Sequence, residues 1–215
     1  MWEPEKIERM SEVLQRDPAA SGVFCNATIV DADLNPLGYT VWDARRFTPE
    51  QRARFAKGEA FAVLVEGEKV QGAALAFRSS VRSRVLPIPA ECWHDAWIGI
   101  VLAACSELRF IDSPLLRYRQ HASNAIGIGS RTGLFRRTGR NLRNLWNVQA
   151  YHTDKLRRLE SRLRFWRELK ARLAEIDRTG LASHIERVER TELQLEVRRD
   201  QIRRRLSIIA PGAVP

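Results

Sequence analysis

The stretch that decides the fold runs His94-Asp-Ala-Trp-Ile-Gly-Ile-Val-Leu-Ala-Ala-Cys105. It opens with an acidic residue in the first turn and is almost entirely apolar after that, which predicts a mostly buried helix from His94 to Cys105. Two short runs follow it, Leu108–Ile111 and Leu115–Arg119, and both have the composition of strands. Helices and strands mixed in this way predict an α/β layer structure.

Upstream of this stretch, the same rules predict alternating helices, strands and turns. A short amphipathic helix begins near Pro4 and ends at Asp17-Pro18. The remaining elements, in order, are a strand at Ser21–Val30, a turn at Asp31–Gly38, a helix at Pro49–Lys57 that Gly58 ends, a buried strand at Val70–Phe77 and a rigid connector at Pro87–Pro89.

Downstream, from about Asn141, the pattern changes to helical spacing throughout. Apolar residues recur every three or four positions from Leu156 to Ile176 and again from Leu181 to Ile209, with Thr179-Gly180 between the two series. Two long amphipathic helices joined by a short glycine turn form an antiparallel hairpin. Ser183 and Glu186 are spaced as a capping box at the start of the second helix.

The charge of the chain is divided between these regions. Residues 1–124 hold 15 Lys and Arg against 16 Asp and Glu, whereas residues 125–215 hold 21 against 10. The longest apolar stretch has ten residues, too few to span a bilayer, and the N-terminus has no secretory-signal pattern. Three widely spaced cysteines form neither a disulfide framework nor a zinc cluster. These features together predict a cytoplasmic protein.

Two positions are candidates for chemistry, and each has a structural alternative. Asp95 is either an ordinary helix N-terminal charge or a general base that takes a proton from a hydroxyl. His121 follows the Leu115–Arg119 strand, in a polar turn with Arg119, Gln120, Ser123 and Asn124. It is either a structural surface histidine or a ligand of a metal or phosphate.

A series of motifs resembles the C-terminal half of bacterial family 2 glycosyltransferases, and more narrowly their rhamnosyltransferase-like members. The motifs, in chain order, are Asn26-Ala-Thr-Ile-Val-Asp-Ala-Asp-Leu-Asn-Pro-Leu-Gly38, Val70-Gln-Gly-Ala-Ala-Leu-Ala-Phe77, Pro87-Ile-Pro89, His94-Asp95 and Tyr118-Arg-Gln-His-Ala-Ser-Asn124. The resemblance covers about residues 2–127. It implies part of a GT-A fold, with an incomplete mixed sheet and flanking helices, followed by the helical hairpin.

The resemblance also implies roles for individual residues. Asp95 matches the base that deprotonates the acceptor hydroxyl in an inverting transfer, and His121 matches a histidine that helps to hold the metal or the diphosphate. Gly72 lies in the loop where acceptor and donor meet. The other residues that the resemblance places in substrate binding are His94, Trp93, Trp97, Arg119, Gln120 and Asn124. For the two tryptophans, ordinary core packing is an equal alternative.

The chain also departs from the family pattern. In the family, an Asp-x-Asp that carries Mg²⁺ or Mn²⁺ immediately precedes the tryptophan matching Trp2, and a βαβ nucleotide-binding half precedes that. Here the chain begins at Met1, Asn26 stands where the family usually has aspartate, and the glycine usual near Glu107 is missing. Neutralisation of the leaving diphosphate and donor alignment supply much of the catalytic effect. We therefore expect this chain to be inactive or weakly active, from a truncated gene or a misplaced start codon.

The leading hypothesis is thus a glycosyltransferase-like protein. It would act on a nucleotide sugar and a cell-surface polysaccharide or lipid-linked glycan. The expected organisation is an acceptor-side half at 1–127, a basic linker at 128–140, an Arg-rich hairpin at 141–209 and a disordered tail at 210–215.

Two alternatives stay open. One is a non-catalytic binding module whose basic hairpin contacts an anionic membrane surface or, less in keeping with its interspersed glutamates, nucleic acid. The hairpin could equally be a solvated, salt-bridged surface, or serve self-association. The other alternative is a subunit whose partner chain supplies the donor half.

Overall fold

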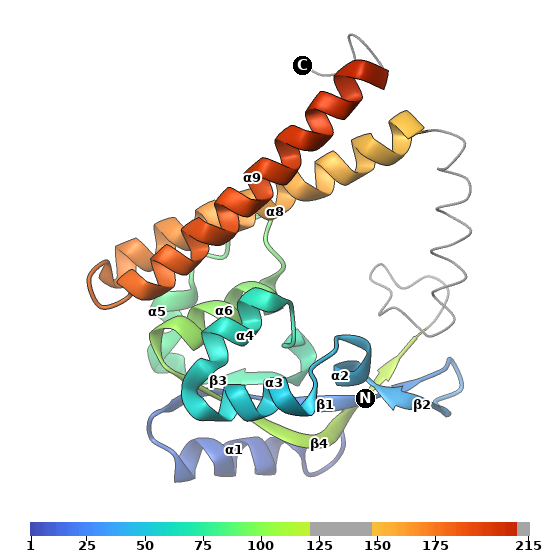
Figure 1. Ribbon diagram of the computed structural model, residues 1–215. Coiled ribbons are helices and arrows are strands. Elements are labelled where there is room, and N and C mark those ends of the chain that lie inside the picture. Colours follow the sequence, from blue (N-terminus) through green and yellow to red (C-terminus); the bar gives the residue numbers. More distant parts are fainter. Residues whose placement is uncertain (121–147, 210–215) are drawn as a thin grey trace. The chain divides into compact units, whose positions relative to one another are not determined.

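The structure is a computed structural model that describes residues 1–120 and 148–209. The chain divides into two compact units, Met1–Ile128 and Gly129–Pro215. In its described part, the first unit mixes helices with a small sheet and the second consists of two long antiparallel helices (Figure 1). The sequence-based expectation of an α/β region followed by a helical hairpin is therefore confirmed at this coarse level.

The sheet is built around one long buried strand, β1 (Ala20–Val30). Along one edge runs β4 (Glu107–Arg119), parallel to β1. The other edge is shared by two shorter antiparallel strands, β3 (Leu75–Phe77) beside the first half of β1 and β2 (Pro36–Thr40) beside its end. A strand with partners on both edges and cover on both faces is expected to be apolar throughout, as this one nearly is.

Three strand predictions differ from the structure. Leu108–Ile111 and Leu115–Arg119 belong to one strand, whose pairing with β1 is irregular around Pro114, a residue with no N–H to donate. The turn after β1 is shorter than expected, because Asp31 accepts the backbone N–H of Asn35 and leaves the following residues free to form β2. In the 70–77 segment only the last three residues form a strand.

Helices cover both faces of the sheet (Figure 1). On one face lies α1 (Lys6–Arg16), whose Met10 is buried. The helices of the other face are α2 (Val41–Ala44), α3 (Pro49–Arg54), α4 (Ala60–Glu66) and α6 (His94–Cys105), and the bounds of α6 are those predicted. The short turns η2 (Gly72–Ala74) and η3 (Ser79–Val81) and helix α5 (Arg82–Val85) complete the unit.

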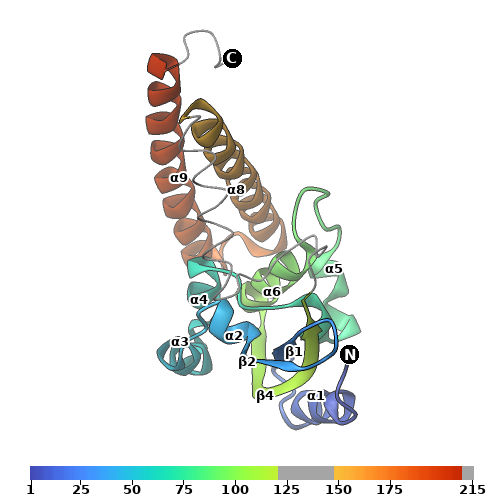
Figure 2. The ribbon, with the colours of Figure 1, turned by 90° about the vertical axis from the view of Figure 1, so that its right-hand side faces the viewer.

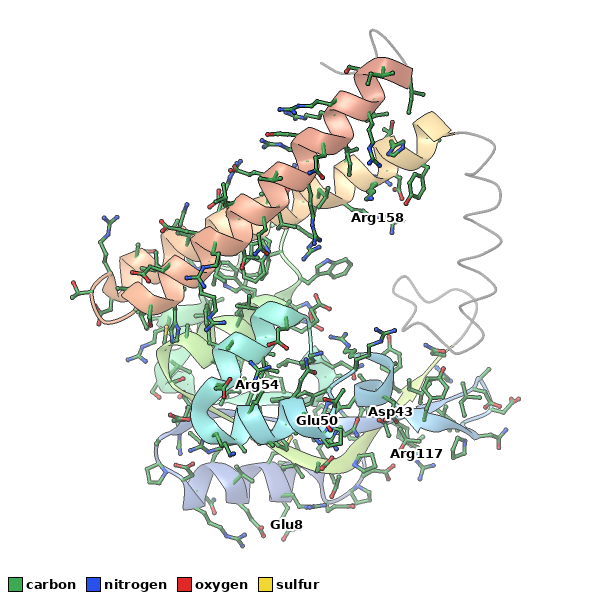
Figure 3. The ribbon with its side chains drawn as sticks, in the orientation of Figure 1. Glu8, Asp43, Glu50, Arg54, Arg117 and Arg158 are labelled. Carbon is green, nitrogen blue, oxygen red and sulfur yellow. The ribbon has the colours of Figure 1, made fainter. Side chains whose placement is uncertain are left out.

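Gly58 ends its helix, as predicted. The helical backbone that begins with α3 is interrupted at this residue, whose φ of 91° is non-helical and is reached at little cost without a Cβ. The segment around it is η1 (Phe55–Glu59), and α4 begins beyond the kink. Arg54, labelled in Figure 3, bridges the kink, with its guanidinium 2.9 Å from Glu59 and 2.7 Å from Glu66.

An aromatic cluster fills the space between β1 and the α2–α4 layer. The rings of Phe24, Trp42, Phe47, Phe55 and Phe110 lie with centroids 4.9–6.2 Å apart, mostly edge to face. Edge-to-face contact adds to the apolar area that these rings bury. The cluster joins residues from four elements (β1, α2, η1 and β4) and from the loop between α2 and α3.

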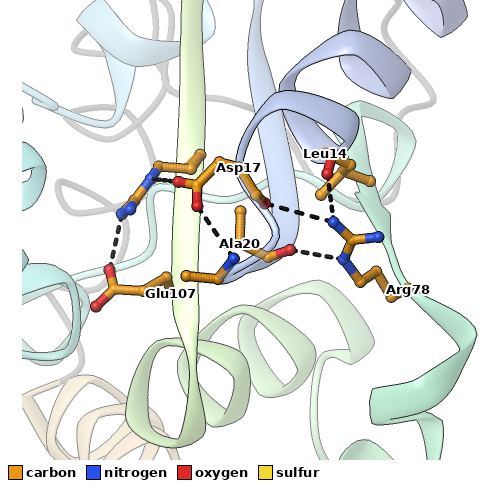
Figure 4. Close-up of polar contacts among 7 residues, drawn as sticks. Leu14, Asp17, Ala20, Arg78 and Glu107 are labelled. Atoms are coloured by element: carbon orange, nitrogen blue, oxygen red, sulfur yellow. Dashed lines mark hydrogen bonds and ion pairs between the residues drawn. The ribbon is translucent and has the colours of Figure 1, made fainter.

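Polar contacts hold the start of β1 against its neighbours (Figure 4). The carboxylate of Asp17 accepts a 2.7 Å bond from Arg109 Nε, and Arg109 Nη1 also reaches Glu107 at 2.7 Å. The guanidinium of Arg78 donates to the backbone carbonyls of Leu14 and Ala20. These bonds join α1 and the starts of β1 and β4.

The second unit is an antiparallel pair, α8 (Val148–Asp177) and α9 (Ala182–Ile209) (Figure 2). Its buried apolar side chains follow the predicted spacing and include Leu159, Leu163, Trp166, Leu173, Val188, Leu195, Ile202 and Leu206. At the turn, Gly180 N donates to Asp177 Oδ1. The capping-box prediction is wrong: α9 begins before Ser183, because Leu181 O already accepts the N–H of Ile185.

Candidate functional site

The candidate site lies where the segment after α4 meets the first turn of α6. The backbone N–H of Gly72 donates to Asp95 Oδ2 at 3.3 Å. Asp95 Oδ1 accepts the N–H of Ala96 at 3.0 Å. The carboxylate is half-buried at the N-terminal end of a helix, where free N–H groups favour negative charge. Two motifs 23 positions apart are thus brought together.

His94 stands beside the same backbone. A Cβ added to Gly72 would lie 2.6 Å from His94 Nε2 and 3.2 Å from His94 Cδ2. Only a residue without a side chain lets the imidazole come this near to the loop. His94 is itself exposed, and the same Cβ would lie 3.5 Å from Asp95 Cβ, so both side chains lie on the same side of Gly72. We name the group Gly72, His94 and Asp95 the acceptor corner, after the role that is proposed for it below.

Glu68 is a second carboxylate near Asp95 that the sequence analysis did not single out. Its pKa is raised, first by burial of the carboxyl group and then by the charge of Asp95, while Arg45 acts in the opposite direction. Arg45 Nη1 lies 3.3 Å from Glu68 Oε2, and 47% of the Glu68 side chain stays exposed. No spacing rule identifies Glu68, because it approaches Asp95 only through the fold.

Two cations hold the loop that carries Glu68 and Gly72. Arg45 Nη1 also donates to Val70 O at 2.8 Å. The buried ammonium group of Lys69 donates to Arg45 O at 2.9 Å and to Arg46 O at 3.1 Å. Burial lowers the pKa of Lys69. These bonds tie the loop to the end of α2 and so fix the position of the Gly72 N–H.

The two tryptophans have different environments. Trp97 is 1% exposed, and its Nε1 donates to Val85 O at 2.8 Å, so it packs in the core and has no free face for a sugar. Trp93 is 55% exposed and directly precedes His94. Of the two, only Trp93 is exposed, and it is adjacent in sequence to the acceptor corner.

Other predicted site residues lie at the end of β4. Arg119 is exposed and is in register with Val30, and Gln120 N donates to Val30 O at 2.8 Å. His121 and Asn124 fall outside the described residues. A shared site of Asp95 and His121 therefore stays a prediction.

No metal site is found among the described residues, which contain no group of three or more His, Cys, Asp and Glu side chains that could hold a metal ion. Asp31 Oδ1 accepts the N–H groups of Asp33 and Asn35, both at 2.9 Å, so this carboxylate is engaged within its own turn.

Asn26 has a structural task where the family pattern has aspartate. Its side chain is 6% exposed, and Oδ1 accepts the N–H of Ala27 at 2.8 Å and that of Trp42 at 3.3 Å. An amide oxygen satisfies both donors without placing a charge beside the aromatic cluster.

Comparison with known proteins finds no matching family model, no matching curated protein and no matching solved structure. Among the described residues, each helix is too short or too polar to cross a membrane.

Proposed function

We propose that this chain is the acceptor side of an inverting glycosyltransferase of the GT-A type. It would act in the transfer of a sugar from a nucleotide-sugar donor to a cell-surface polysaccharide or lipid-linked glycan. The observation that carries the proposal is the acceptor corner, in which the Gly72 N–H orients the Asp95 carboxylate beside the exposed His94 ring. The motif resemblance of residues 2–127 supports the same assignment.

In the proposed reaction, Asp95 accepts the proton of the acceptor hydroxyl. The hydroxyl oxygen forms a bond to the anomeric carbon from the face opposite the leaving diphosphate, and the bond between that carbon and the phosphate oxygen breaks. The Gly72 N–H holds one carboxylate oxygen in place, and Trp93 and His94 lie where they can contact the sugar of the acceptor. The diphosphate charge, neutralised by a divalent metal in the family, has no metal site among the described residues.

Positioning of the donor, which in the family is the task of the nucleotide-binding half, contributes about 7–11 kcal/mol to such reactions. A peripheral place at the cytoplasmic face of the membrane belongs to the same proposal, since acceptors of this class are assembled there.

A transfer assay tests the function. We would supply the chain with labelled nucleotide sugars and glycan acceptors, and compare Asp95→Asn with the unchanged protein. Loss of a general base lowers the rate by about 10²–10⁴-fold. The matched control is Asp112→Asn, which removes an exposed carboxylate on β4 that pairs with Arg52. Transfer that survives Asp95→Asn, or an equal loss in the control, would contradict the proposal.

A further inference from the structure

The outer side of α9 separates its charges by sign. All four acids between positions 187 and 209, which are Glu189, Glu192, Glu196 and Asp200, lie at helical spacing along one side. Five arginines lie along another side, on which Glu186, in the first turns of α9, is the one acid between positions 182 and 209. We define the basic face as these arginines and the apolar residues between them, namely Arg187, Arg190, Leu193, Val197, Arg198, Arg204, Arg205 and Ile208.

On the acidic side, cross-helix pairs neutralise the charges. Arg167 lies 2.8 Å from Glu192 and 2.6 Å from Glu196. Farther along, Arg203 lies 2.9 Å from Glu160. This side of the hairpin has the paired charges of a solvated helical surface.

Compensation is weaker on the basic face, where Asp200 acts on Arg204 through its charge without forming an ion pair. Within 148–209, none of its five arginines forms an ion pair, and all are exposed. On α8, Arg162 adds to the same charge, since burial and, next, the charge of Arg198 lower its pKa. Figure 3 shows nitrogen-tipped side chains along the length of α9.

The same face exposes apolar side chains. Leu193 is 62% exposed, Val197 52% and Ile208 80%, all on the side of α9 opposite its buried residues. Arg190 and Arg204 lie in line with them. Arginines that flank exposed aliphatic side chains on one helix face are typical of helices that lie in a lipid headgroup layer.

We propose that the basic face of α9 docks on a bilayer surface that contains anionic lipids. The arginines would bind lipid phosphates, and Leu193, Val197 and Ile208 would enter the headgroup layer. A second copy of the chain fits less well, because it would bring a second set of weakly compensated arginines. Nucleic acid would satisfy the arginines but would leave the three aliphatic side chains in water. The inference does not depend on the proposed transfer reaction.

Vesicle sedimentation of the full 215-residue chain tests the proposal. Phosphatidylcholine vesicles with about 30% phosphatidylserine should bind the chain, and vesicles of phosphatidylcholine alone should bind it at least about tenfold more weakly. Raising the salt from about 0.05 M to about 0.5 M should release most of the chain, because the screening length falls about threefold.

Two matched variants locate the surface. Arg198→Glu/Arg205→Glu should weaken binding at least about tenfold. The control, Arg16→Glu/Arg82→Glu, makes the same change in net charge on exposed positions of the first unit and should change binding less than about twofold. Leu193→Gln/Val197→Gln keeps the charge and should remove the part of the binding that resists salt. Circular dichroism confirms that each variant keeps its helices.

Four results would overturn the proposal: equal binding to both kinds of vesicle, equal losses in the charge variant and its control, unchanged binding in the Leu193/Val197 variant, or stronger binding to duplex DNA that the aliphatic variant leaves unchanged. Light scattering settles the remaining case. If the chain does not bind anionic vesicles but is a dimer, and Leu193→Gln/Val197→Gln converts that dimer to a monomer, the face serves self-association.

Discussion

Gly99 and Val70 are in direct contact across the junction of α6 and the loop that carries Gly72. A Cβ placed on Gly99 would lie 2.9 Å from Val70 Cγ2 and 3.1 Å from Val70 Cβ. The two residues belong to segments that each hold part of the acceptor corner, since Asp95 is one turn before Gly99 and Gly72 is two residues after Val70. Their contact therefore sets how closely those segments approach.

Gly99→Ala is expected to destabilise the first unit by about 1–3 kcal/mol. The added methyl group meets a β-branched side chain that is 2% exposed and has no room to move. Thermal unfolding followed by circular dichroism measures the change. The double variant Gly99→Ala/Val70→Ala should recover part of the loss. A Gly99→Ala protein as stable as the unchanged one would mean that this packing is looser than described.

Gly72→Ala should leave stability within about 1 kcal/mol and yet displace His94. The methyl group collides with the end of an exposed imidazole, which can rotate away, and not with the backbone. Gly58→Ala is the contrasting variant: its φ of 91° makes any Cβ costly, by about 1–2 kcal/mol. Unfolding curves together with the NMR shifts of His94 separate the two effects. Unmoved His94 signals in Gly72→Ala would refute the close contact.

The sequence predicted α6 to the residue, because its apolar run and acidic first turn are local signals. It also predicted the hairpin, whose heptad-like spacing persists over many turns. It missed β2 and the continuous β4, because these depend on pairing with β1 and not on local composition. It also predicted correctly that Gly58 ends the helix begun by Pro49, because a glycine with a left-handed backbone is a local signal.

Asp17→Asn should make the free energy of unfolding fall less steeply as the pH is lowered. The hydrogen bond from Arg109 holds the pKa of Asp17 below its ordinary value, with smaller help from the charge of Arg109 and opposition from burial. Such a group adds stability above its unfolded pKa, about 3.9, and the gain is lost as the pH falls through the lower folded value. Chemical denaturation across this range measures it.

The partner variant is the control for that prediction. Arg109→Gln should also reduce the loss of unfolding free energy at low pH. The Asp17→Asn/Arg109→Gln double variant should reduce it no further, because the Arg109–Asp17 interaction is removed in all three variants. Additive effects of the two single variants would show that Asp17 owes its low pKa to other groups.

Glu192→Ala should destabilise the hairpin by about 1–3 kcal/mol. Glu192 is 9% exposed and receives bonds from Arg167 at 2.8 Å and Lys170 at 2.7 Å. Burial opposes its ionisation, but those two cations keep its pKa low. Glu189→Ala, an exposed acid one turn earlier, should cost less than about 0.5 kcal/mol. Equal costs in denaturant titrations would contradict the cross-helix role of Glu192.

For the candidate site, the structure brings together Gly72, His94 and Asp95, three residues that the sequence motifs had singled out. The sequence did not identify Glu68 or Arg45, whose importance arises from contacts between segments far apart in the chain. It also could not choose between core packing and sugar stacking for the two tryptophans. Burial decides this for Trp97, since its indole N–H bonds to the backbone of Val85.

The most direct measurement of the central claim is an NMR titration of the 215-residue chain with oligosaccharides from bacterial surface polysaccharides. If the acceptor corner binds a glycan, the amides of Gly72 and Asp95 and the side-chain signals of Trp93 and His94 will shift in a saturable way. His94→Ala will weaken this binding, while Asp95→Asn will bind with similar affinity because a base is needed for transfer more than for binding. No saturable binding by any glycan, or shifts confined to residues away from Gly72 and Asp95, would contradict the account.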